Sequence, residues 1–171
     1  MKTYLAGSLF NEAEVTQRLK EGKILKENFK DMELYNPIEA PCNDKSKLPT
    51  ANDIFMQDTQ EILASELVIA DISNPVDAGV FAELGIIWMC NYIHFMAERG
   101  ITLEDILKCI PKKELIAHLS EIRKGTAHKY EGNHIPVGFN QYMIGLVENI
   151  GKIKDNFGEV VEDLKNMKGG N

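Results

Sequence analysis

Residues 67–85 read LVIADISNPVDAGVFAELG, and this stretch decides the fold that the sequence predicts. Leu67 to Ile72 is an almost unbroken apolar run rich in β-branched residues, which is typical of a parallel strand covered on both faces. A polar loop follows from Ser73 to Asp77, and its Asn74-Pro75 pair favours the start of a helix. In open α/β sheets, ligands bind beyond the carboxyl ends of the strands, where loops and helix N-termini converge. We therefore expect a binding site along this loop.

Glu83 is the residue of this stretch that most needs an explanation. It lies between Phe81 and Leu84, in a helix that is apolar nearly all the way round. Such a helix is expected to be buried, and a buried carboxylate is costly unless it is paired, hydrogen-bonded or protonated. Position alone leaves two interpretations open, a structural hydrogen bond or Arg partner on the one hand and a catalytic carboxylate on the other.

Three strings of the sequence resemble the nucleoside 2-deoxyribosyltransferase family. They are DAGVFAELG at residues 77–85, SELVIADI at 65–72 and YLAGSLF at 4–10. The resemblance covers roughly residues 1–90 well and 134–165 loosely, and its central string is the specific part. It favours the catalytic interpretation of the carboxylate in that string.

The resemblance implies a role for each of several polar residues. Glu83 would be the nucleophile, Asp77 would contact the sugar, and Asp58 on an upstream helix would transfer a proton at the base. Glu61 lies one turn from Asp58, and only the resemblance favours Asp58 over it. Asn140, in FNQYM at residues 139–143, resembles a late element of the family that reaches the site of a neighbouring subunit.

Four further residues are candidates for substrate binding: Tyr4, Gly7, Ser8 and Gly79. Gly7 would let a ligand approach the backbone, and Ser8 or the following N–H groups could hold a sugar hydroxyl or phosphate. A glycine needed only for the turn, and a tyrosine that is simply part of the core, are the alternatives. One glycine after the first strand is neither a dinucleotide fingerprint nor a Walker loop.

We expect a single α/β domain over residues 1–171, with a flavodoxin- or Rossmann-like parallel sheet of four or five strands flanked by helices. The expected elements, besides the strand and helix of 67–85, are strands at Lys2–Ala6, Glu33–Tyr35 and within Ile135–Val147, and helices at Glu12–Lys30, Ile54–Ser65 and Asn156–Met167. Residues from about 91 to 125 depart from the family pattern and are expected to form a helical insertion, with helices opening at Thr102 and Pro111. The polar loop Glu39–Pro49 is either a lid or a solvated connection.

The bulk composition narrows the classes of partner. The net charge of -7 argues against a nucleic acid polymer, and no apolar run reaches the length of a membrane helix. Three cysteines without a signal peptide indicate reduced thiols in the cytoplasm, and four histidines without metal-ligand spacing give no reason to expect a metal. We expect no cofactor, a small-molecule deoxynucleoside and nucleobase as substrates, and at least a homodimer.

The function that the resemblance implies is transfer of a 2-deoxyribosyl group between nucleobases through a covalent intermediate on Glu83. One alternative is a related deoxynucleoside 5'-monophosphate N-glycosidase, which passes the same intermediate to water. The lack of an Arg directly after Ser8 argues for a free nucleoside instead. A nucleotide-binding module without turnover is the alternative of another class.

Overall fold

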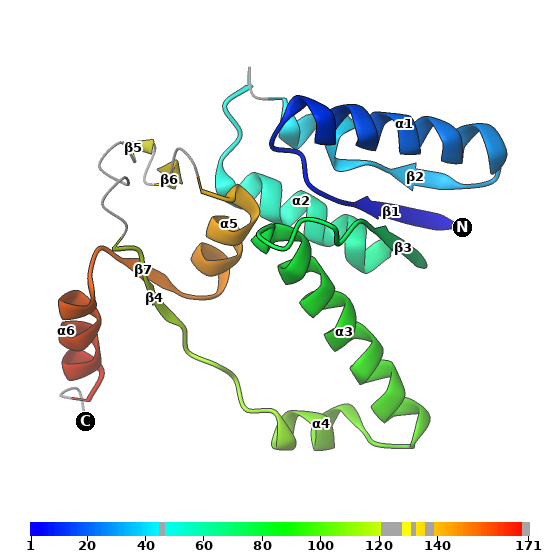
Figure 1. The fold of residues 1–171 in the computed structure, drawn as a ribbon. Helices are drawn as coiled ribbons and strands as arrows, with labels where there is room; N and C mark the ends of the chain where they lie inside the picture. The colour runs from blue at the N-terminus through cyan, green and yellow to red at the C-terminus, as the bar shows by residue number, and fades with distance from the viewer. Residues whose placement is uncertain (45–46, 121–127, 131–132, 136–138, 169–171) are drawn as a thin grey trace.

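The computed structural model describes residues 1–44, 47–120, 128–130, 133–135 and 139–168, and it contains a parallel sheet of three strands with helices packed against it (Figure 1). The order of the strands is β2-β1-β3, where β1 is Lys2–Ala6, β2 is Glu33–Tyr35 and β3 is Leu67–Ala70. The α/β class and these three strands are confirmed.

The central strand β1 holds the core together. Its register places Tyr4 beside Tyr35 of β2 and Val68 of β3. Tyr4 and Ala6 point to one face of the sheet, where they pack with Ile62. Two helices, described below, cover this face. The side chains of the face therefore contact residues of both helices.

Three helices connect and cover these strands. Helix α1 (Glu12–Asn28) begins after Asn11, and α2 (Ala51–Ala64) begins after Thr50, which forms a reciprocal capping box with Asp53. Helix α3 (Ala78–Glu98) begins after Asp77, whose carboxylate accepts hydrogen bonds from two backbone N–H groups of the first turn. The prediction that Asn74-Pro75 opens this helix was therefore three residues early, because the aspartate makes the capping bonds.

The predicted helical insertion is only partly correct. Residues 91–98 belong to α3 itself, and Thr102 caps the short helix α4 (Leu103–Cys109) as predicted. No helix opens at Pro111, since residues 111–115 are irregular and Ile116–His118 form strand β4. Residues 121–125 lie outside the described part of the chain. The strand forms because it pairs with a distant segment, a partner that local periodicity does not reveal.

The C-terminal third also differs from the prediction. Strands β5 (His128–Tyr130) and β6 (Asn133–Ile135) pair antiparallel, and the region expected to continue as a strand becomes helix α5 (Gln141–Ile150). Strand β7 (Lys152–Lys154) pairs parallel with β4, and the closing helix α6 (Phe157–Lys168) is confirmed. The described residues thus contain five parallel strands, divided between sheets of three and two instead of one sheet.

Helix α3 is less buried than its apolar sequence predicts. Only Gly79, Val80 and Glu83 are buried, whereas Trp88 is 62% exposed. Figure 1 shows the helix running away from the sheet toward α4. By length and composition alone α3 could cross a membrane, which is weak evidence because core helices of soluble proteins can meet the same criteria. The first two turns of α3 carry the residues that are buried in the domain.

Candidate active site

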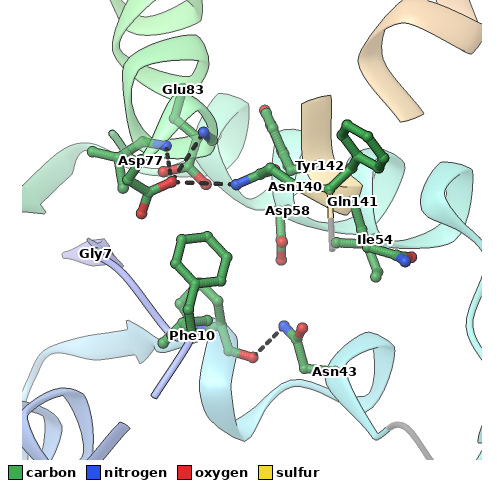
Figure 2. Close-up of a pocket in the computed structure, with 15 residues that line it drawn as sticks. Gly7, Phe10, Asn43, Ile54, Asp58, Asp77, Glu83, Asn140, Gln141 and Tyr142 are labelled. Carbon is green, nitrogen blue, oxygen red and sulfur yellow. Dashed lines mark hydrogen bonds between the residues drawn. The ribbon is translucent and has the colours of Figure 1, made fainter. Parts of the chain in front are cut away.

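A cavity of about 230 Å³ lies beyond the carboxyl end of β1, between the start of α3 and the start of α5 (Figure 2). Three carboxylates line it, and they are Asp58 from α2, Asp77 and Glu83. Gly7, Gly79 and Asn140 also line it, so six of the eight predicted site residues meet here. The cavity is small and enclosed by several elements, which suits a small molecule more than a polymer.

Glu83 is buried at the floor of the cavity, with 7% of its surface exposed. The Tyr4 hydroxyl donates a hydrogen bond of 2.7 Å to its Oε1, while its Oε2 is buried without a hydrogen-bond partner among the described residues. Burial raises the pKa of Glu83 to about 8; the bond from Tyr4 opposes this rise, and the charges of Asp58 and Asp77 add to it. The arrangement holds one oxygen by a hydrogen bond and leaves the other, which is also buried, without one among the described residues.

Asp58 is the second buried carboxylate, and the structure separates it from Glu61. The Tyr35 hydroxyl donates to Asp58 Oδ1 at 2.7 Å, and the Cys42 thiol donates to the same oxygen at 3.7 Å. Glu61 instead pairs with Lys2 at 2.8 Å and does not line the cavity. Only Asp58 therefore faces the position that a substrate would occupy.

Asp77 acts first as the cap of α3. Its Oδ1 accepts from the backbone N–H groups of Gly79 and Val80 and from Asn140 Nδ2, and its Oδ2 accepts from Ser8 Oγ at 2.7 Å. A Cβ at Gly79 would lie 2.6 Å from the Asn140 amide, so this contact requires glycine. Asn140 thus lies in the cavity of its own chain. The expectation that it reaches the site of a neighbouring subunit stays a prediction, because the structure contains a single chain.

Tyr4 and Ser8, which were predicted to bind substrate, do not line the cavity. Tyr4 is fully buried and holds Glu83, and Ser8 is buried and holds Asp77. Both therefore donate hydrogen bonds to carboxylates that line the cavity without lining it themselves. Tyr4 is a core aromatic, which was the alternative interpretation, and its hydroxyl reaches Glu83 from the core.

Gly7 lies against a buried cation that the sequence did not single out. A Cβ at this position would collide with the guanidinium of Arg18, which is buried in α1. Arg18 pairs with Asp71 at 2.6 Å and with Glu21 at 2.9 Å. The polar sequence of α1 does not indicate that Arg18 is buried, because its partner Asp71 lies far away in the chain, directly after β3.

Sequence reasoning also missed Phe10, Asn43 and Tyr142, which line the cavity, and the two donors to Asp58. Phe10 is 61% exposed and closes one side of the cavity in Figure 2. Asn43 and Cys42 belong to the short helix η2 (Pro41–Asn43), so part of the loop expected to be either a lid or a solvated connection is helical and contributes Asn43 to the cavity lining. Tyr35 is the neighbour of Tyr4 in the pairing of β1 with β2. A prediction of this register would have placed Tyr35 next to the site.

Comparisons with known proteins bear on this site. A relative, the uncharacterized protein UU063 of Ureaplasma parvum serovar 3, is 34% identical over 92 residues, which are 50% of this chain and 58% of that protein. The chain therefore matches little more than half the length of this relative. A crystal structure of a conserved protein from Enterococcus faecalis V583 is similar over 97% of this chain and 98% of that chain, with 25% identity and a TM-score of 0.44.

The sequence model of the family described as nucleoside 2-deoxyribosyltransferase matches residues 3–99. The match includes the three cavity carboxylates and spans more than half of the chain. The chain belongs to the nucleoside 2-deoxyribosyltransferase family.

Proposed function

We propose that the protein transfers a 2-deoxyribosyl group between nucleobases through a covalent ester on Glu83. One observation carries the proposal: in the cavity a buried carboxylate, fixed by Tyr4 at one oxygen, has its other oxygen without a partner among the described residues, beside a second buried carboxylate. Two carboxylates at one site are the usual equipment for cleaving a bond at an anomeric carbon.

The proposed reaction has two displacements. The reactive form of Glu83 is the ionised one, which its pKa of about 8 makes the minor form at neutral pH. In that form Oε2 attacks the anomeric carbon as the C–N bond breaks; the bonding electron pair leaves with the nucleobase, and Asp58 supplies a proton to that base. In the second step a ring nitrogen of the incoming nucleobase attacks the same carbon and gives its proton to Asp58. The Glu83 carboxylate leaves, so the sugar keeps its original configuration and both side chains return to their starting states.

The surroundings of the cavity support a free nucleoside as substrate. Three carboxylates line the cavity, and they would repel a phosphate. Arg18, the nearby buried cation, is already paired with Asp71 and Glu21. The exposed ring of Phe10 offers a surface on which a nucleobase could stack.

The test is incubation of the protein with deoxyinosine and adenine, followed by chromatography. We expect deoxyadenosine and hypoxanthine, and we expect Glu83→Gln to lower the rate at least about a thousandfold. Hypoxanthine with free deoxyribose would favour the N-glycosidase instead. Neither product would favour a binding module without turnover.

A second test addresses the intermediate and the 2' position. A 2'-hydroxyl destabilises the positive charge that develops at the anomeric centre, and in a closed site it costs about 1–3 kcal/mol if it finds no partner. We expect strong preference for deoxyribonucleosides, and a covalent adduct on the Glu83 peptide when a slow 2'-fluoro analogue is supplied. Mass spectrometry that located the adduct on another carboxylate would refute the assignment of Glu83.

We also propose that the protein works in the cytoplasm as a homodimer or larger homo-oligomer. The support is the exposed apolar face of α3, where Phe81, Trp88 and Phe95 are each more than 40% exposed. Residues 84–97 contain no Asp, Glu, Lys or Arg, so this face offers nothing to a charged partner. A second copy presents an identical apolar face, which a two-fold axis brings into contact with the first.

A further inference from the structure

Two tyrosines on neighbouring strands each serve one of the two carboxylates. Tyr4 of β1 and Tyr35 of β2 are paired in register, and their rings stack with centroids 5.5 Å apart and an interplanar angle of 17°. The Tyr4 hydroxyl donates to Glu83 and the Tyr35 hydroxyl donates to Asp58, both at 2.7 Å. The parallel register thus delivers one O–H donor to each carboxylate.

The donors to Asp58 keep their protons at neutral pH. Burial is the main cause that raises the pKa of Tyr35 far above its usual range and the pKa of the Cys42 thiol to about 11. Both groups therefore point a hydrogen at Asp58 Oδ1, at 2.7 Å and 3.7 Å. An oxygen that accepts two hydrogen bonds is a poor place for a proton, so the two donors disfavour protonation at Oδ1.

We propose that Tyr35 is a positioning residue that occupies Asp58 Oδ1 and thereby orients the carboxyl group that exchanges its proton with the nucleobase. The inference rests on the proposed function, because it concerns the orientation of Asp58, the general acid of that reaction. Tyr35 itself does not line the cavity and does not touch the substrate position. Other titratable groups that interact with Asp58 include Tyr4 from β1, Glu83 from α3 and Tyr142 from α5.

The test compares two leaving groups in the whole protein. Hypoxanthine leaving from deoxyinosine needs a proton, whereas the base of 7-methyl-2'-deoxyguanosine leaves as a neutral molecule without one. We expect Tyr35→Phe to lower kcat for deoxyinosine at least about tenfold and to change kcat for the methylated substrate less than about twofold. The alkaline limb of the pH profile should move to higher pH for deoxyinosine, because loss of a donor disfavours the ionised carboxylate and the general acid then keeps its proton to higher pH.

Tyr4→Phe is the matched control, since it removes the corresponding donor from Glu83. It should slow both substrates, because nucleophilic attack is common to both. Retained turnover of the methylated substrate by Tyr35→Phe also shows that the variant is folded. Equal losses for the two substrates, or no loss for deoxyinosine, would overturn the inference while the proposed function stands; an inactive wild-type protein would overturn both.

Discussion

At the scale of single residues, the buried carboxylate of Glu83 ties the stability of the protein to pH. Its pKa is about 8 in the folded protein and near its ordinary value of 4.5 in the unfolded chain. Between these values the folded state keeps a proton that the unfolded state has lost, so the stability contributed by this group is complete below about pH 4.5 and is lost as pH rises through about 8.

Glu83→Gln should remove this dependence, because a glutamine has no proton to lose. We expect the free energy of unfolding of the wild-type protein to fall relative to the variant by at most about 1.4 kcal/mol per pH unit across this window. Urea unfolding at a series of pH values measures the difference. Parallel curves for the two proteins would show that Glu83 is already ionised in the folded state.

Phe10 is the residue placed to stack on a nucleobase, since its exposed ring lines the cavity. Stacking of a base on an aromatic ring contributes about 1–3 kcal/mol, so Phe10→Ala should raise KM by about 5- to 100-fold and change kcat less. Phe29→Ala is the control, because Phe29 is 54% exposed at the end of α1 and does not line the cavity. Equal KM values for both variants would exclude a stacking role.

At the scale of elements, the cap of α3 links helix stability to the geometry of the site. Asp77→Ala removes the acceptor for two N–H groups and for Ser8 and Asn140, so it should cost about 1–2 kcal/mol of stability and also lower kcat. Thr102→Ala removes the cap of α4 outside the cavity and should cost about 1 kcal/mol without affecting kcat. Denaturant unfolding and steady-state kinetics of the two variants give the comparison.

The result separates two roles of a cap. If both variants lose stability and only Asp77→Ala loses turnover, the cap of α3 positions the site as well as the helix. If Asp77→Ala keeps wild-type kcat, the capping cluster does not hold Glu83 in its active position.

At the scale of the whole molecule, helix α3 presents an apolar seam to solvent. Phe81, Trp88 and Phe95 recur every seven residues on it, and Trp88 stacks on Tyr92 with centroids 5.2 Å apart. A helix of this length spans about 30 Å, which is enough for two antiparallel copies to form a continuous apolar contact. We expect the protein to be at least a dimer at micromolar concentration.

The double variant Trp88→Glu with Phe95→Glu should be monomeric, because four like charges would be buried in the contact. Sedimentation equilibrium measures the mass of both proteins. Leu19→Glu, which places a charge on an exposed apolar position of α1, is the control and should stay oligomeric. A monomeric wild-type protein with full activity, or one that binds lipid vesicles through α3, would contradict the second copy as the partner.

Local patterns in the sequence were sufficient for the N-terminal half of the fold. The strands at Lys2–Ala6, Glu33–Tyr35 and Leu67–Ala70 follow from short apolar runs bounded by turns, and Glu83 stood out because a carboxylate in an apolar helix requires a partner. The same kind of pattern failed for β4, since three residues of strand carry little periodicity and their stability comes from pairing with β7.

The sequence by itself therefore determined that a carboxylate would be buried in the helix that follows a parallel strand, and it identified the residues of the central string. Only the tertiary structure decided what surrounds them: Tyr35 and Cys42 on Asp58, Arg18 beneath Gly7, and Asn140 in the cavity of its own chain. These contacts join residues far apart in the chain, and hydrogen bonds of that kind depend on how helices and strands pack. Periodicity and capping depend only on neighbours within one or two turns, which is why they singled out Glu83 but not the residues that support it.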